Sequence, residues 1–313
     1  ENIKYTAREK EIIECLCFSF LLVCIDPTGE EKEKYEQRFI PKLIPPEKAQ
    51  EIRESKETEA VTEPEEYPDI ENFSPEPDGM LGRARALRAI NDDVVGYIRI
   101  SNTYIDYPVV QYDGENLDEN GNAYYMDKDI YGNYLDSGTI FMDYRDNFGP
   151  DKSQQSQNIM LYGHNMLNGT KFATLHYYRQ DDTFYDDNPI IEFSSNYNDY
   201  KYIIFGYFIT SYGESAYGPE FAYWDMENMD EKEFNEYVET VRDRSVISPD
   251  IDVEYGDQLI TLQTCYMDED NSRMLVVGRR LREHETADNI DKASTAKTES
   301  DDSDVSESDE SQE

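Results

Sequence analysis

The chain has 313 residues, of which 38% are hydrophobic and 13% aromatic, enough to build one large folded domain or two small ones. Its 69 acidic and 29 basic residues give a net charge of -40, which argues against nucleic acids and anionic lipids as ligands of the general surface. Its 26 tyrosines and single tryptophan favour strands with one half-buried face, so the composition indicates a β-rich protein.

The strongest apolar stretch lies near the N-terminus, at residues 12–25 (IIECLCFSFLLVCI). It is shorter than the roughly 20 residues of a relaxed membrane-spanning helix. Basic residues precede it and acidic residues follow, a bias that places the N-terminus in the cytoplasm and the rest of the chain outside. We expect residues 1–25 to be a membrane anchor. The alternatives are a cleaved signal peptide, a lipoprotein signal ending at Cys24, and a buried core helix.

Two further segments have compositions that are typical of unfolded chain. Residues 26–80 carry 17 acids against 7 bases and hold 8 of the 13 prolines, which predicts an acidic, proline-rich stalk. Residues 284–313 alternate serine with acidic residues and carry 11 acids and 2 lysines, which predicts a disordered acidic tail. Residues 81–283 between them are expected to form one domain.

Two helices are expected in this domain. The first follows a possible cap at Asp78 and has apolar residues at helical spacing: Leu81, Ala84, Leu87 and Ile90. The second spans 231–245, where Asp230 and Glu233 have the spacing of a capping box. Its apolar stripe, which indicates packing rather than a cofactor site, is Phe234, Tyr237, Val238 and Val241.

The rest of the domain reads as strands separated by Gly, Asn, Asp and Pro. The expected strands are 95–100, 103–112, 138–143, 158–164, 190–193, 201–212, 259–265 and 274–281. Several of them alternate branched or aromatic residues with polar ones, which favours an antiparallel barrel or sandwich. Nothing resembles a phosphate-binding loop, a dinucleotide fingerprint or a metal-ligand cluster, so we expect no cofactor and no metal.

Three chemically active side chains stand at the ends of these strands. His164 and Cys265 each close an expected strand, and Arg273 directly precedes the last one. A thiol is only a few per cent thiolate near neutral pH, so a cysteine nucleophile needs a nearby imidazole or cation. A guanidinium can also stabilise the oxyanion that forms when a thiolate attacks an amide. Each residue alone is better explained as core filler, loop residue or surface charge. Together they would supply a nucleophile, a base and a cation.

The segments around these residues resemble the sortase family. The strand TLQTC ends at Cys265, Arg273 follows eight residues later, and LYGHN surrounds His164 upstream. Two more stretches, GTIFMDYR (138–145) and GHNMLNGTKFATL (163–175), are similar to the class B branch, as is the long helix before the cysteine strand. The resemblance covers about residues 81–283. It implies a mainly β fold, a closed antiparallel β-barrel with helical additions.

Residue by residue, the resemblance implies Cys265 as nucleophile, His164 as general acid/base and Arg273 as the cation that binds substrate and oxyanion. Thr264, Gln263 and Asn165 could line the substrate groove or make only local hydrogen bonds. Glu269 and Asp270 lie between the cysteine and the arginine. They could orient His164, but a solvated loop is the favoured interpretation.

The implied reaction is transpeptidation without a cofactor. The enzyme would cleave an NPxTx-like C-terminal sorting signal of a secreted protein and form a thioacyl intermediate at Cys265. A peptidoglycan-precursor amine in the cell wall, or a pilin lysine, would resolve that intermediate. The enzyme would be a single-pass protein of the cell membrane with its catalytic domain extracellular. The alternatives are a tyrosine-rich surface binding module without activity, and a thiol hydrolase that uses water.

Overall fold

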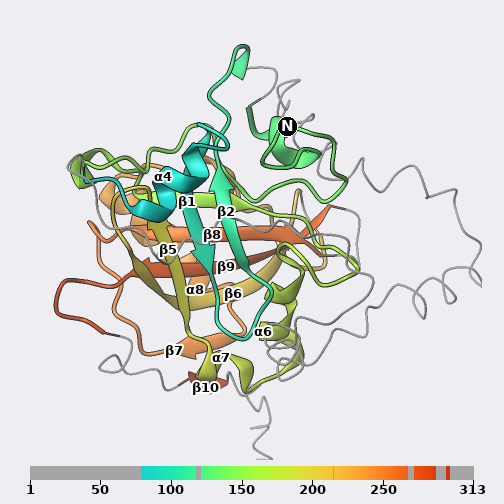
Figure 1. The fold of residues 1–313 in the computed structure, drawn as a ribbon. Coiled ribbons are helices and arrows are strands. Elements are labelled where there is room, and N and C mark those ends of the chain that lie inside the picture. Colours follow the sequence, from blue (N-terminus) through green and yellow to red (C-terminus); the bar gives the residue numbers. More distant parts are fainter. Residues whose placement is uncertain (1–78, 118–120, 214, 267–270, 287–293, 297–313) are drawn as a thin grey trace, which may run out of the picture.

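A computed structural model gives the arrangement of the folded part of the chain (Figure 1). It describes residues 79–117, 121–213, 215–266, 271–286 and, for the backbone, 294–296. The expected anchor at 1–25, nearly all of the stalk and most of the acidic tail therefore lie outside the described residues. Within the described part, no helix is both long enough and apolar enough to cross a membrane.

Eight strands close into a barrel in the order β1-β2-β3-β4-β8-β9-β6-β5 (Figure 1). They are β1 (Val94–Arg99), β2 (Asp106–Val110), β3 (Phe141–Met142), β4 (Asn158–Tyr162), β5 (Ile190–Ser195), β6 (Lys201–Ser211), β8 (Leu259–Cys265) and β9 (Ser272–Arg280). The expected closed β-barrel is confirmed. Its pairings are mostly antiparallel, but β2 with β3 and β4 with β8 run parallel. A parallel pair needs a long crossover, and β5, β6 and the helix that follows them lie between β4 and β8 in sequence.

Several short elements were not expected from the sequence. A separate two-stranded sheet joins β7 (Ile247–Pro249) to β10 (Ser294–Ala296). Short helices fill the long connections: η1 (Gly121–Met126), η2 (Lys152–Gln154), η3 (Ala173–His176), α6 (Tyr177–Gln180), α7 (Phe184–Asp187) and η4 (Tyr223–Asp225). One or two turns carry too little periodicity to be read from a sequence.

Both expected helices are present. Helix α4 (Gly82–Arg88) contacts β1, and its N-cap, Leu81, makes no side-chain cap; the proposed cap, Asp78, lies outside the described residues. Helix α8 (Glu231–Arg244) begins with the predicted capping box. The Asp230 carboxylate accepts from the Glu233 amide at 2.9 Å, and the Glu233 carboxylate accepts from the Asp230 amide at 2.9 Å. The apolar stripe of α8 is buried against the outer face of the barrel.

The core has two layers, one inside the barrel and one between the barrel wall and α8. Side chains alternate along β8, so Ile260 and Leu262 join the inner layer while Leu259 joins the outer layer. By the same alternation, Cys265 leaves the wall on the outer side, as Leu259 does. The register of β8 therefore directs the only cysteine of the described residues away from the barrel interior.

Candidate active site

Cys265 and Arg273 lie directly opposite each other on neighbouring strands. The antiparallel ladder of β8 and β9 pairs Cys265 with Arg273. Residues paired in this way project from the same face of a sheet, so the thiol and the guanidinium leave the barrel wall on the same outer side. Cys265 is partly exposed and forms no disulfide. The eight-residue spacing in the sequence thus becomes a cross-strand contact.

His164 reaches the same edge from the other neighbour of β8. The parallel ladder pairs Tyr162 with Gln263, and the Gly163 amide donates to the Gln263 carbonyl at 3.1 Å. Two residues further along each chain, just beyond the end of β4, an extension of this register places His164 beside Cys265. Gly163 permits this path, because a Cβ there would lie 2.7 Å from the ring of Phe172.

The His164 ring is fixed by a backbone carbonyl. Its Nε2 lies 2.8 Å from the Met126 oxygen at the end of η1. A carbonyl only accepts hydrogen bonds, so Nε2 carries the proton and Nδ1 is the unprotonated nitrogen of the neutral ring. Burial lowers the pKa of His164 below its usual value, while the bond to Met126 acts in the opposite direction. The ring is therefore a neutral imidazole near physiological pH, the form that can accept a proton.

Arg273 is not a surface charge, since only 2% of it is exposed. Its guanidinium lies 5.1 Å from the centre of the Tyr212 ring, and Nη1 donates to the Ser272 carbonyl at 2.8 Å. Tyr212 in turn packs on Trp224, with ring centres 4.9 Å apart. Aromatic faces attract cations more strongly where water is excluded. Arg273 is thus a largely desolvated cation held next to the cysteine.

The three side chains suggested for the substrate groove differ in position. Asn165 donates from Nδ2 to the Cys265 carbonyl at 3.1 Å, which ties the ends of β4 and β8 together. Gln263 is 1% exposed and accepts from the Tyr223 hydroxyl at 2.7 Å. Thr264 is also 1% exposed, and its hydroxyl has no hydrogen-bond partner among the described residues. Contact of these residues with substrate stays a prediction. Glu269 and Asp270 lie outside the described residues.

A buried hydrogen-bond network around the Asp143 carboxylate connects β4 with the aromatic segment near Arg273. Asp143 is 1% exposed and accepts from the Tyr162 hydroxyl at 2.8 Å and from Nε of Arg145 at 2.9 Å. Arg145 also bonds to the Trp224 carbonyl and to Asp225. The stretch GTIFMDYR therefore links β4 to the aromatic segment that packs on Arg273. Its carboxylates are held by partners within the protein.

Sequence reasoning missed three features of this site: the Met126 carbonyl, the aromatic segment around Tyr212 and Tyr223, and a second histidine, His176. The His176 Nε2 lies 3.2 Å from the Cys265 oxygen. None of these features carries a local sequence signal, because each partner lies far along the chain. Within the described part of the chain, no group of three or more His, Cys, Asp or Glu residues could hold a metal ion.

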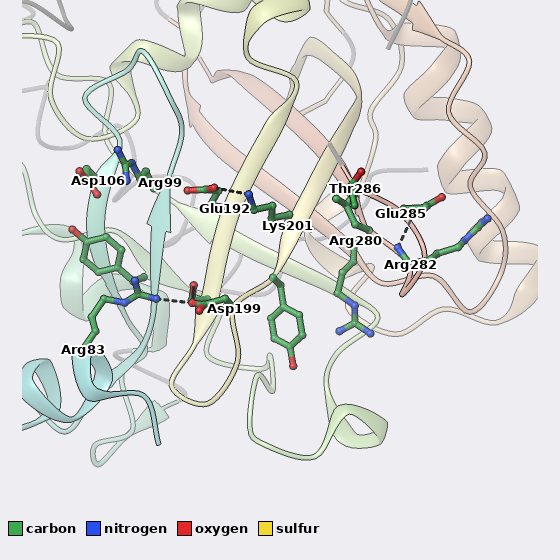
Figure 2. Close-up of a pocket in the computed structure, with 14 residues that line it drawn as sticks. Arg83, Arg99, Asp106, Glu192, Asp199, Lys201, Arg280, Arg282, Glu285 and Thr286 are labelled. Carbon is green, nitrogen blue, oxygen red and sulfur yellow. Dashed lines mark hydrogen bonds and ion pairs between the residues drawn. The ribbon is translucent and has the colours of Figure 1, made fainter. Parts of the chain in front are cut away.

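A charged pocket of about 970 Å³ lies elsewhere, on β1, β5, β6 and β9 (Figure 2). Arg280, at its wall, is seven residues along β9 from Arg273, about 23 Å at the usual rise of a strand. Four of the charged side chains of the pocket form two ion pairs with one another. Arg83 lies 2.9 Å from Asp199, and Lys201 lies 3.0 Å from Glu192 (Figure 2).

Comparisons with known proteins identify the family that the chain resembles. The sortase domain family matches residues 98–281. Sortase B of Listeria monocytogenes is 30% identical over 197 residues, which cover 62% of this chain and 72% of that protein. Sortase B of Staphylococcus aureus is 30% identical over 199 residues, which cover 63% and 74%. The X-ray structure of Clostridium perfringens sortase B has a TM-score of 0.52 at 25% identity and covers 63% of this chain and 99% of its own.

Proposed function

Because the chain belongs to the sortase family, in its class B branch, and is therefore a cysteine transpeptidase, we propose that Cys265 is its nucleophile. His164 is the general acid/base and Arg273 the oxyanion-binding cation in this proposal. The observation that supports it most strongly is the cross-strand pairing of Cys265 with Arg273, with His164 two residues beyond the end of β4, the strand on the other side of β8.

The position of His164 suits proton transfer in both half-reactions. Its neutral ring takes the proton of the Cys265 thiol, and the thiolate attacks the carbonyl carbon of the scissile amide. The tetrahedral intermediate then collapses, the C–N bond breaks, and the imidazolium returns the proton to the leaving amine. A thioester at Cys265 remains. An incoming amine attacks it by the reverse sequence, forms the new amide and restores the thiol.

Arg273 has the chemistry of an oxyanion partner. A guanidinium presents a planar fork of donors that can hold a peptide carbonyl and the oxygen on which negative charge develops. The Tyr212 ring keeps it desolvated, and an ionic hydrogen bond is stronger where water is excluded. A well-placed oxyanion donor stabilises the transition state by about 3 kcal/mol.

The substrate of this proposal is an NPxTx-like C-terminal sorting signal on a secreted protein, cleaved after the threonine. The acceptor is a cell-wall peptide amine or a pilin lysine. The class B membership supports this substrate class. A sortase domain suggests an enzyme of the cell envelope, and we propose that residues 1–25 anchor it in the cell membrane with the catalytic domain outside.

Two rival functions remain testable. A binding module would have no need of a partly exposed cysteine paired with a buried arginine, so the geometry favours the enzyme. A thiol hydrolase would use the same residues, with water as acceptor. Only the products separate it from a transpeptidase.

The test is product analysis with a library of sorting pentapeptides, each incubated with and without an added amine such as triglycine. The expected result is cleavage of NPxTx-like peptides, with the amine-linked product dominant when the amine is present. Cys265→Ala should fold and give no cleavage. Cleavage by that variant would contradict the nucleophile assignment. Cleavage with no amine-linked product would identify a hydrolase instead.

A further inference from the structure

The carbonyl of Cys265 is held from two sides. Asn165 donates to it from the segment that follows His164, at 3.1 Å. His176, the last residue of η3, lies with its Nε2 3.2 Å from the same oxygen. Strand β8 ends at this residue, and on the side of this carbonyl its neighbour β4 has already ended, while the amide of the next residue still donates to the Ser272 carbonyl of β9 at 3.0 Å. The two side chains give this carbonyl the support that a longer β4 would give.

His176 also contacts the residue after the cysteine. Its ring stacks on Tyr266, with centres 5.4 Å apart and planes inclined by 29°. Arg179, one turn further along on α6, places its guanidinium 5.7 Å from the same tyrosine ring. Tyr217 meets that ring edge-on at 6.4 Å. The segment η3–α6 therefore clamps the Cys265–Tyr266 peptide through both its carbonyl and its next side chain.

The protonation state of His176 fits this contact. A carbonyl only accepts, so Nε2 bears the hydrogen of the bond to Cys265. Only 7% of the residue is exposed, and burial lowers its pKa to about 4. The ring is thus neutral at physiological pH, with one N–H that donates to the carbonyl, and it has no role in the proton transfers assigned to His164.

We propose that His176 is a positioning residue for the reaction: its N–H holds the Cys265 carbonyl and so fixes the direction of the nucleophile, while the stacking of its ring on Tyr266 makes a smaller contribution. This inference rests on the proposed function, because it takes Cys265 to be the attacking group. A displacement of about 1 Å at a reacting atom can cost two orders of magnitude in rate. The Cys265–Tyr266 peptide lies at the end of a strand and next to the sulfur, so a shift of this peptide would displace the reacting atom.

The test compares two substitutions of His176, one that removes its N–H donor but keeps an aromatic ring and one that removes the ring but keeps a donor. His176→Phe keeps an aromatic ring against Tyr266 and loses the N–H. His176→Gln loses the ring and keeps an amide N–H at a similar reach. His284→Phe, at an exposed histidine beside the charged pocket, is the matched control. Each variant is assayed for kcat and KM with a sorting peptide, and for alkylation of Cys265 by iodoacetamide at high pH, where the thiolate is fully formed.

We expect His176→Phe to lower kcat about tenfold with KM changed less than about twofold, and His176→Gln to recover kcat to within about threefold of the parent. Alkylation should change by less than about twofold, because a small reagent needs no directed thiolate. His284→Phe should match the parent in both assays. If His176→Phe fails to fold, His176→Met, which also lacks the donor, takes its place.

Full kcat in His176→Phe would overturn the inference, and so would equal losses in His176→Phe and His176→Gln. A parallel loss of turnover and alkylation would assign His176 to folding alone. Cys265→Ala is assayed alongside to separate the two hypotheses. If it retains turnover, the proposed nucleophile is wrong. If it is inactive while His176→Phe is fully active, only the inference about His176 fails.

Discussion

Each end of strand β9 has an arginine whose guanidinium packs on a tyrosine ring, but the surroundings of the two arginines differ. At one end the Arg273 guanidinium lies 5.1 Å from the Tyr212 ring, and at the other the Arg280 guanidinium lies 5.0 Å from the Tyr200 ring. Arg280 lines a wide pocket and donates to the Gln258 and Gln155 side chains at 2.9 and 3.1 Å. Arg273 is buried opposite a cysteine.

The difference between the two ends of β9 indicates which of them can support catalysis. The pocket around Arg280 is rich in charge, and two of its cations, Arg83 and Lys201, are paired with carboxylates of the same pocket (Figure 2). At the other end of the strand, a buried cation lies opposite a thiol, and the Asp143 carboxylate is engaged with Arg145 and Tyr162. Interactions of a desolvated charge are strong enough to act on a transition state.

The largest expected effect separates the two arginines. Arg273→Lys keeps the charge but loses the planar fork, so kcat/KM should fall by about two orders of magnitude or more, while Cys265 still reacts with iodoacetamide. Arg280→Lys, the matched change at the other end of the strand, should leave kcat/KM within about twofold. The measurement is steady-state kinetics with a sorting peptide. Comparable losses of kcat/KM in both variants, or no loss in either, would contradict the proposed difference between Arg273 and Arg280.

The second prediction concerns pH, since the site edge holds buried histidines. Burial, opposed by the bond to the Cys265 carbonyl and assisted by Arg179, lowers the folded-state pKa of His176 to about 4, below its unfolded value of about 6.5. As the pH falls below 6.5 the unfolded state binds the proton first, so stability is lost progressively down to pH 4. Between pH 7 and pH 5 this costs about 2 kcal/mol, and His164 acts in the same direction.

Urea unfolding at several pH values measures this effect. His176→Gln should reduce the loss of unfolding free energy between pH 7 and pH 5 by about 2 kcal/mol, whatever its stability at pH 7. If His176→Gln lost as much unfolding free energy between pH 7 and pH 5 as the parent, His176 would not be the group that titrates.

A smaller effect is expected away from both ends, at the start of α8. Asp230→Ala removes one half of the capping box and should lower the unfolding free energy by about 1 kcal/mol, with kcat/KM unchanged. Thermal unfolding and peptide cleavage measured on the same sample check both statements. Loss of activity without loss of stability would place α8 in the site.

The smallest effect is expected inside the charged pocket. Asp199 is well exposed, and its ion pair with Arg83 spans 2.9 Å. Pairs of this kind contribute about 0–1 kcal/mol, so Asp199→Asn should change the unfolding free energy by less than about 1 kcal/mol and leave cleavage intact. Reduced cleavage would show that the pocket takes part in the reaction, contrary to the comparison of the two ends.

The parts that the sequence predicted are those with local signals. The capping box of Asp230 and Glu233, the strand that ends at Cys265 and the closed barrel followed from patterns or from the family resemblance. The parallel pairing of β4 with β8 and the contact of His176 with Cys265 did not. Their partners are about 90 to 100 residues apart, and only the closed barrel brings them together. The burial of Arg273 was not predicted for the same reason, because it depends on Tyr212, about 60 residues upstream, just after the end of β6.

The most direct test of the central claim is peptide-mapping mass spectrometry of the protein after incubation with an NPxTx-like peptide in the absence of amine. The account predicts an acyl adduct with the mass of the peptide up to its threonine. The adduct should lie on the fragment that contains Cys265, and it should disappear when an amine is added. Peptide cleavage with an adduct on any other residue, or with no adduct and full activity in Cys265→Ala, would contradict it.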